Sequence, residues 1–437
     1  MTKKQSASAA SADSSSSLPT PGKAPSVKKA APIKVTAKKT TKKTAAKKTA
    51  TKRAASKKTA PKKTTTKKLA AKKAATKRPA SNSTANKAAG HESDIKAKRT
   101  RTPARAPFEV AGHRVTAGKR MRMELPIGNL MSGTPVALPL IVVHGKHDGP
   151  VVWLSAAIHG DEICGVETIR QVLDTINAPT LSGTIIAAPV VNVHGFNTND
   201  RYLPDRRDLN RSFPGSQRGS LASRIAYLFM KEVVMRSDVG IDLHTGSDLR
   251  TNLPQIRCDL DHTPTLELAN VFGAPIVIDA RLRDGSLRQA TVEAGKIMLL
   301  FEGGEASRFD PVAIAAATAG VLRTLNHLGL TDIEVPAGQQ SLYSRSTSWS
   351  RASRSGIVHL DAGLGEIISA KQQVATIYDP FGKALSKIKS KYDGIVVGHS
   401  QAPLVNRGDA ISHVARIMTD APKPEWDSPG TIDDEEQ

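Results

Sequence analysis

Short, nearly continuous apolar runs alternate with helix-like segments through the middle of the chain. Residues 137–145, 151–158 and 184–193 are such runs, and this pattern is typical of strands that are buried on both faces. Residues 163–176 instead carry apolar side chains at helical spacing. Asp148-Gly149-Pro150 predicts a turn between the first two strands.

The same alternation continues as far as residue 328. Residues 197–216 form a polar loop whose length favours a functional role. Strands that alternate with helices predict an α/β fold, with a mostly parallel or mixed central sheet flanked by helices. The further strands are expected at residues 239–244, 274–278 and 296–301, and the further helices at residues 220–236, 265–272, 287–294 and 312–328.

The pattern changes after about residue 330. Residues 341–354 are polar and rich in serine, and residues 356–417 contain short alternating segments separated by Gly and Asp. This spacing predicts a small all-β domain, a barrel or a sandwich. Residues 421–437 are rich in Pro and acidic residues, and we expect them to be disordered.

The charge of the chain lies almost entirely at its N-terminal end. The formal net charge is +23, but residues 1–105 alone carry 30 Lys and Arg against 3 Asp and Glu, a net of +27. These residues contain almost no large apolar side chain, so they cannot bury enough surface to offset the entropy of ordering. The chain therefore divides into four predicted parts: a disordered basic arm (1–105), an α/β domain (106–335), a small β domain (336–420) and a disordered acidic tail (421–437).

A basic pair recurs every five residues between Lys42 and Arg78. A step of five residues advances about 140° on a helix, so the pairs share no helical face and the arm is expected to be a flexible polycation. In composition it is similar to the Lys/Ala/Pro tails of linker histones and bacterial histone-like proteins. Such an arm predicts binding of DNA, RNA or another polyanion without sequence preference. A solvated tail without a fixed partner is the alternative.

Two cysteines, Cys164 and Cys258, do not make a disulfide framework and fit a reducing compartment. No apolar run approaches the ~18 residues of a membrane span. The first residues lack the apolar core of a secretory signal, although their Ser- and Ala-rich composition leaves a transit peptide as an alternative. We therefore expect a cytoplasmic protein.

Candidate metal ligands lie where two of the expected strands end. His159 and Glu162 follow residues 151–158, and His244 ends the strand at residues 239–244. The first pair alone is also typical of a hydrogen-bonded core histidine. Ligands gather at the carboxyl ends of parallel strands, however, and two imidazoles with a carboxylate are the ligand set of a hydrolytic zinc site. Asp242 is expected to orient His244.

Two further groups complete this chemistry. Glu302 follows the strand at residues 296–301, where a carboxylate can move a proton from water to a leaving amine. A structural carboxylate is the alternative role, and Glu305 is an alternative base. The polar loop carries Arg201 and Arg211, whose guanidinium groups suit bidentate binding of a substrate carboxylate.

Four motifs occur in order along the chain and carry a family resemblance. They are His159-Gly160-x-Glu162, Asp208-Leu209-Asn210-Arg211-x-Phe213-Pro214-Gly215, Asp242-Leu243-His244-Thr245 and Glu302-Gly303-Gly304. Together they resemble the succinylglutamate desuccinylase/aspartoacylase family, which is distantly related to zinc carboxypeptidases. The resemblance covers residues 107–420 and implies an α/β zinc-hydrolase domain followed by a small β domain.

The resemblance also implies roles for individual residues. One Zn²⁺ per chain would be bound by His159, Glu162 and His244, and Glu302 would be the general base and acid. Arg201, Asn210 and Arg211 would hold the substrate's carboxylate or its polarised carbonyl; these are the remaining site residues.

The predicted function is hydrolysis of the amide bond of an N-acyl amino acid or a related small amide. In class this is a zinc metallohydrolase that acts on carbon–nitrogen bonds other than peptide bonds, in linear amides. Two alternatives remain open at this point. One is a carboxypeptidase-like peptidase, and the other is a polyanion-binding protein that acts through residues 1–105.

Overall fold

The computed structural model describes residues 105–247 and 249–422. Two predictions concern residues that lie outside this range, apart from residues 105, 421 and 422. They are the disorder of the basic arm and of the acidic tail, and the binding of a polyanion by the arm. In the described part of the chain, no helix is long and apolar enough to cross a membrane.

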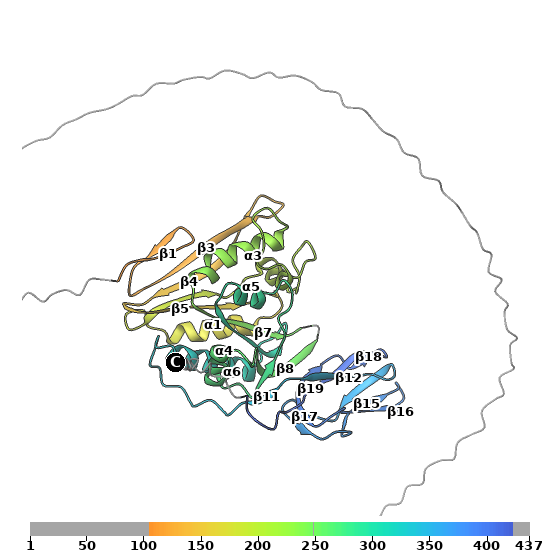
Figure 1. The fold of residues 1–437 in the computed structure, drawn as a ribbon. Helices are drawn as coiled ribbons and strands as arrows, with labels where there is room; N and C mark the ends of the chain where they lie inside the picture. Colours follow the sequence, from red (N-terminus) through yellow and green to blue (C-terminus); the bar gives the residue numbers. More distant parts are fainter. Residues whose placement is uncertain (1–104, 248, 423–437) are drawn as a thin grey trace, which may run out of the picture. The chain divides into compact units, whose positions relative to one another are not determined.

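The structure is built on one large mixed sheet with helices on both of its faces (Figure 1). The helices are α1 (Cys164–Thr175), α2 (Val193–Thr198), α3 (Leu221–Glu232), α4 (Thr263–Phe272), α5 (Leu287–Glu293) and α6 (Pro311–His327), with 3-10 turns at Leu209–Arg211 and Val234–Arg236. The strands up to residue 305 are β1 (Phe108–Val110), β2 (His113–Val115), β3 (Lys119–Asn129), β4 (Pro135–His144), β5 (His147–Ala156), β6 (Ser182–Ala188), β7 (Val239–Gly246), β8 (Arg250–Cys258), β9 (Ile276–Asp279) and β10 (Ile297–Glu305).

The centre of the sheet is parallel and its flanks are antiparallel. Strands β10, β7, β5 and β6 lie side by side in parallel, while β8 pairs antiparallel with β10 and β4 pairs antiparallel with β6. Helices α1, α4 and α6 cover one face of the sheet, and α3 and α5 pack in the core on the other. The predicted α/β fold is therefore confirmed, with a mixed rather than a purely parallel sheet.

The helices begin where side chains accept hydrogen bonds from free backbone amides. Ser220 caps α3, Ser286 caps α5 and Asp310 caps α6, each accepting from an amide in the first turn. Pro311 follows Asp310 at the start of α6, where a missing amide hydrogen has no cost. These local signals fix where the covering helices begin.

The C-terminal strands form a second sheet and also extend the first. The strands are β11 (Leu342–Ser344), β12 (Thr347–Arg351), β13 (Gly356–Leu360), β14 (Ile367–Ile368), β15 (Gln373–Tyr378), β16 (Ala384–Lys389), β17 (Gly394–Ser400), β18 (Leu404–Val405) and β19 (Ala410–Ala415). Strands β16, β15, β13 and β18 make a four-stranded sheet, whereas β12, β17 and β19 continue the large sheet beyond β8.

Three local predictions differ from the structure. Asp148-Gly149-Pro150 lies inside β5 rather than in a turn, because Gly149 packs against the backbone of Gly183, where a Cβ atom would come within 2.8 Å of its nitrogen. Residues 302–305 belong to β10 instead of following it. Strands β3 and β8 were not predicted, since both are rich in polar side chains and lack a continuous apolar run.

Candidate metal centre and cavity

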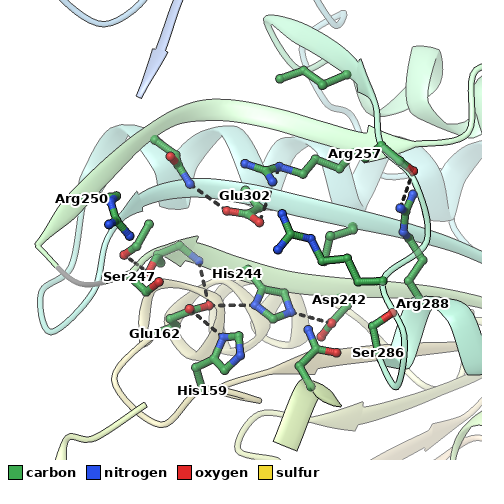
Figure 2. A pocket seen from close by; sticks show the side chains of 18 of the residues that line it. His159, Glu162, Asp242, His244, Ser247, Arg250, Arg257, Ser286, Arg288 and Glu302 are labelled. Carbon is green, nitrogen blue, oxygen red and sulfur yellow. Dashed lines mark hydrogen bonds and ion pairs between the residues drawn. The ribbon is translucent and has the colours of Figure 1, made fainter. Parts of the chain in front are cut away.

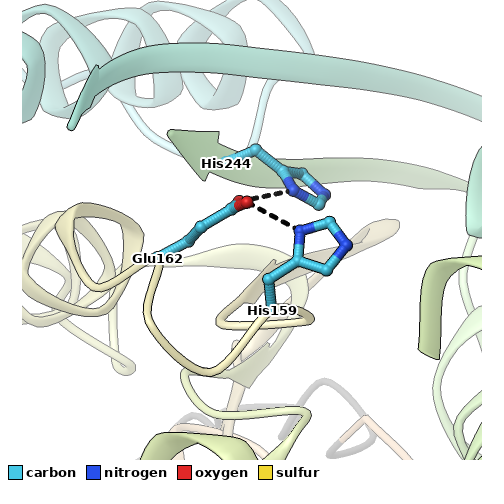
Figure 3. A group of neighbouring side chains, drawn as sticks. All are labelled: His159, Glu162 and His244. Carbon is cyan, nitrogen blue, oxygen red and sulfur yellow. Dashed lines mark hydrogen bonds and ion pairs between the residues drawn. The ribbon is translucent and has the colours of Figure 1, made fainter. Parts of the chain in front are cut away.

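His159, Glu162 and His244 meet at one point (Figure 3). Their ligand atoms lie within 4.8 Å of one another, and all three side chains are buried. The Nδ1 atom of His159 lies 2.7 Å from Oε1 of Glu162, and the Nδ1 atom of His244 lies 2.8 Å from Oε2. A loop after β5 supplies two of these residues and β7 supplies the third.

Two further carboxylates hold the opposite sides of the imidazole rings. Nε2 of His159 lies 3.2 Å from Oδ1 of Asp208, and Nε2 of His244 lies 2.7 Å from Oδ2 of Asp242. With Asp208 and Asp242 at the Nε2 atoms, each ring presents its Nδ1 atom to the centre, where it would bind a divalent metal ion in its deprotonated form. The residues therefore fit a metal ion. The expected contact of Asp242 is present, whereas that of Asp208 was not anticipated.

The electrostatics of this group are set by burial and by close pairing. Burial raises the pKa of Glu162, but the two imidazoles outweigh burial and hold that pKa well below its ordinary value. Burial lowers the pKa of His244, but Asp242 and Glu162 raise it well above its ordinary value. The carboxylate form of Glu162, which is the form that binds metal ions, is thus the stable one.

Gly160 allows the loop between the first two candidate ligands to pack tightly. A Cβ atom at this position would lie 2.0 Å from the carbonyl carbon of Gly195, so any side chain would push the loop away from α2. Glycine between His159 and Glu162 thus reflects a close approach of two backbones.

Glu302 lines the same cavity as the candidate metal ligands (Figure 2). It is the register partner of His244 on the neighbouring strand. Its Oε2 atom accepts a hydrogen bond of 2.7 Å from Nδ2 of Asn252, and its Oε1 atom lies 3.6 Å from Nε of Arg257. Glu305 instead pairs with Arg308 and lines a different pocket.

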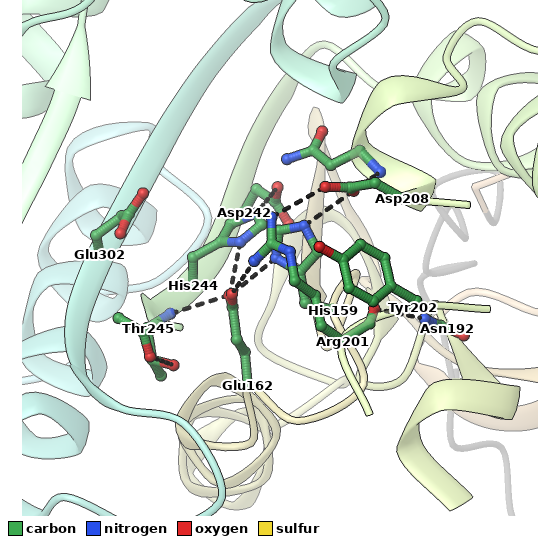
Figure 4. A network of polar contacts seen from close by, with 12 residues as sticks. His159, Glu162, Asn192, Arg201, Tyr202, Asp208, Asp242, His244, Thr245 and Glu302 are labelled. Carbon is green, nitrogen blue, oxygen red and sulfur yellow. Dashed lines mark hydrogen bonds and ion pairs between the residues drawn. The ribbon is translucent and has the colours of Figure 1, made fainter. Parts of the chain in front are cut away.

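Arg201, Asn210 and Arg211 also line this cavity, but they are not equally free to bind a substrate. Arg201 is in two ion pairs, with Glu162 at 3.3 Å and with Asp208 at 3.0 Å (Figure 4). Asn210 uses its carbonyl oxygen to accept from the amide of Leu287 at the start of α5, at 2.9 Å, which leaves its NH₂ group to donate elsewhere. The Arg211 side chain is exposed and donates to the backbone carbonyl of Asn210.

The cavity has a volume of about 450 Å³ and is lined by residues from distant parts of the chain. Sequence reasoning missed those on β8, namely Arg250, Asn252 and Arg257, because it did not recognise the strand. It also missed Trp349 on β12 and His413 on β19, whose rings stack with centroids 4.6 Å apart. A run of spaced polar residues directly after a candidate ligand strand is the signal that could have found β8.

Comparison with known proteins agrees with this arrangement. Residues 148–328 match the sequence model of the succinylglutamate desuccinylase/aspartoacylase catalytic domain. The N-alpha-acetyl-L-2,4-diaminobutyric acid deacetylase of Halomonas elongata is 29% identical over 310 residues, which cover 68% of this chain and 91% of that protein.

Solved structures share the fold. The ectoine utilization protein of Ruegeria pomeroyi, in a product-bound structure, is 23% identical with a TM-score of 0.62, over 68% of this chain and 95% of that one. A succinylglutamate desuccinylase/aspartoacylase of Rhodobacter sphaeroides is 24% identical with a TM-score of 0.62, over 69% and 96%. Residues 148–328, which hold the four motifs in order around one cavity, are thus similar to the succinylglutamate desuccinylase/aspartoacylase catalytic domain.

Proposed function

We propose that this protein is a zinc-dependent deacylase that hydrolyses the amide bond of an N-acyl amino acid or a related small amide. The observation that carries the proposal is that two imidazoles and a carboxylate converge in a cavity that Glu302 also lines. The name of the Halomonas elongata relative, a deacetylase of an N-acetyl amino acid, supports the same reaction class.

His159, Glu162 and His244 would hold one zinc ion through two Nδ1 atoms and a carboxylate oxygen. Zinc bound there supplies a Lewis acid for the amide carbonyl and makes water a better nucleophile near neutral pH. Asp208 and Asp242 keep the two rings in the orientation and the tautomer that this binding needs.

Glu302 is proposed to move the proton. Its carboxylate would accept a proton from the attacking water and pass it to the nitrogen of the leaving amine. The hydrogen bond from Asn252 and the ion pair with Arg257 orient this carboxylate from the neighbouring strand. Glu305, the alternative base, lines another pocket, and this favours Glu302.

Asn210 and Arg211 are proposed to bind the α-carboxylate of the substrate. The Arg211 guanidinium and the NH₂ group of Asn210 are the donors that remain for such a contact. Arg201 lies closer to the metal centre and is tied to two carboxylates, so we assign it to the developing negative charge on the amide oxygen.

The size of the cavity favours a small amide over a peptide. A volume of about 450 Å³ is in the range of small-molecule sites. Trp349 and His413 from the C-terminal strands form part of its wall and narrow the space for a longer chain. Carboxypeptidase-like cleavage of peptides therefore remains the second candidate.

Two measurements on the full-length protein test the proposal. The first is hydrolysis of a panel of N-acetyl, N-succinyl and other N-acyl amino acids with zinc added. The second is metal analysis of His159→Ala and His244→Ala, with the exposed His113 changed to Ala as a control for loss of a histidine. We expect both site variants to lose zinc and activity and the control to keep both. Hydrolysis by a variant that retains no metal would contradict the proposal.

A further inference from the structure

The positive charge of this protein lies in a segment that the proposed reaction does not use. Residues 1–105, the basic arm, carry 30 Lys and Arg against 3 Asp and Glu. Residues 106–437, which we call the body, carry 33 Lys and Arg against 37 Asp and Glu. The body therefore has no net positive charge, and any attraction of the protein for a polyanion falls on the arm.

The densest charge of the basic arm is a regular linear array. Eight basic pairs recur every five residues from Lys42-Lys43 to Lys77-Arg78, and no Asp or Glu interrupts them. Leu69 is the one large apolar residue of this array, and residues 1–105 contain no Phe, Tyr or Trp. The array thus offers charge for a phosphate backbone, but neither apolar side chains for a membrane nor aromatic side chains that stack on bases. These properties fit a linear, double-stranded polyanion that is bound without sequence preference.

The arm joins the body at a fixed point. Arg105 is partly buried, and its Nη1 atom donates to the carbonyl oxygens of Gly183 at 2.7 Å and of Gly145 at 3.3 Å. Its Nε atom lies 3.1 Å from Oδ1 of Asp148. Gly183 and Asp148 are each the second residue of a strand, in β6 and in β5, and these two strands run in parallel. Arg105 is therefore held at the edge of the sheet where the parallel strands begin.

The candidate metal centre lies at the opposite edge of the same sheet. His159 and Glu162 follow the carboxyl end of β5, whereas Asp148 lies at its amino end. Ten residues of strand put roughly 30 Å between these two ends, at about 3.3 Å per residue. A polyanion that binds next to Arg105 therefore does not cover the metal centre.

The cavity itself suits neither the arm nor a duplex. Among the described residues, seven arginines line it against four carboxylates, so it repels a polycation. Its volume of about 450 Å³ is that of a small-molecule site, which a double helix does not enter.

We propose that the basic arm binds the phosphodiester backbone of double-stranded DNA, and that the body attached to it at Arg105 keeps its cavity open while the arm is bound. The arm thereby localises the protein on DNA without reading its sequence. This inference goes beyond the proposed function and does not depend on it, because binding by the arm requires neither the metal ion nor the reaction.

Fluorescence anisotropy of the full-length protein with a labelled duplex over a series of NaCl concentrations tests the binding. Each basic side chain that neutralises a phosphate contributes about −0.9 to the slope of log K against log salt concentration. If half of the basic side chains of the eight pairs are engaged, the slope is about −7. A second duplex of unrelated sequence, and an RNA duplex of equal length, should bind within about 10-fold, since they present the same backbone chemistry. Absence of binding at low salt, or a larger preference for one sequence, would overturn the proposal.

Two full-length variants show whether the array is responsible. In the first, both residues of all eight pairs are changed to Gln. In the matched control, every Lys of these pairs is changed to Arg, which keeps the charge. We expect the Gln variant to lose about 10²- to 10³-fold in affinity at low salt and the control to bind like wild type, because binding without sequence preference is almost entirely electrostatic. Unchanged affinity in the Gln variant would contradict the assignment to the arm.

A membrane surface is the competing partner. Vesicles of equimolar phosphatidylcholine and phosphatidylserine are compared with the duplex at equal salt and equal concentration of negative charge. We expect weaker binding to the vesicles, because the array has no apolar face to insert. Tighter binding to the vesicles than to the duplex would reject DNA as the partner.

The open cavity is tested by zinc affinity, measured by competition with a chelator with and without saturating duplex, and with the duplex alone as the blank. We expect equal affinities in the two conditions. A loss of zinc affinity of more than about 10-fold, which is the scale of removing a contact next to a metal ligand, would show that bound DNA reaches the metal centre and would overturn this part of the proposal. Neither measurement needs hydrolysis, so failure of the deacylase and failure of DNA binding are distinguishable.

Discussion

The Asp242→Asn substitution tests how the protein prepares His244 for a metal ion. Asp242 is fully buried, and its two oxygens accept from Nε2 of His244 and from Oγ of Ser155, each at 2.7 Å. Asparagine has the same shape, and its carbonyl oxygen can still accept from His244 while its NH₂ group donates to Ser155. The substitution therefore removes a charge and leaves the packing intact.

The expected loss of zinc affinity follows from that charge. A carboxylate behind a histidine ligand raises the basicity of the ring, and its removal typically lowers metal affinity 10- to 100-fold, or about 1.4 to 2.7 kcal/mol. Because no solvent reaches Asp242 to replace its charge, we expect the upper half of that range. Ser155→Ala keeps the charge and removes one hydrogen bond, so its loss should be smaller.

Zinc affinity is measured by competition with a chromophoric chelator at neutral pH, and circular dichroism checks that each metal-free variant is folded. Asp238→Asn is the control, because Asp238 precedes the same strand, is exposed and accepts from the amide of Val151 rather than from a candidate metal ligand. Equal zinc affinities in wild type and in a folded Asp242→Asn would refute the role assigned to Asp242.

Three further results are expected. Glu302→Gln should keep its zinc and lose about 10²- to 10⁴-fold in kcat, while Glu305→Gln should not; steady-state kinetics with metal analysis decides between them. Gly160→Ala should lower zinc affinity in the same chelator competition, because its Cβ atom collides with the backbone of Gly195. Burial, with the charges of Arg257 and Arg250, lowers the pKa of His413 from its ordinary 6.5 to about 3 in the folded state, so the unfolded chain binds more protons between these pH values. The free energy of unfolding should fall with pH from 6.5 to 4 by about 3 kcal/mol more in wild type than in His413→Gln, measured by urea unfolding.

The sequence was sufficient for the parts of the fold that follow from local patterns. Continuous apolar runs predicted the central strands, and helical spacing predicted α1 and α6, because both elements are buried on the faces that the pattern marks. The sequence was insufficient to predict β8, whose polar residues Arg250, Asn252 and Arg257 line the cavity. A strand that lines a polar site lacks the apolar signal by which strands are recognised.

The candidate site likewise contains residues that the sequence could bring together and residues that it could not. His159, Glu162 and His244 could be brought together from the sequence, since parallel strands end at a common edge. The contact of Asp208 with His159 could not, because it depends on how a long loop folds back over that edge. Trp349 and His413 could not be predicted as cavity residues, since they come from strands more than 100 residues after His244 that join the sheet through β17.

Different segments of the chain supply the candidate metal ligands and the arginines that line the cavity. The candidate metal ligands come from β7 and the loop after β5, whereas Arg257 and Arg283, which also line the cavity, come from β8 and the loop before α5. Glu302 is the point where the two halves meet, because β10 pairs with β7 on one side and with β8 on the other. Substitutions at Arg283 should therefore leave the candidate metal ligands in place. Substitutions at Arg257 should alter binding and proton transfer together, since this side chain also holds the Glu302 carboxylate.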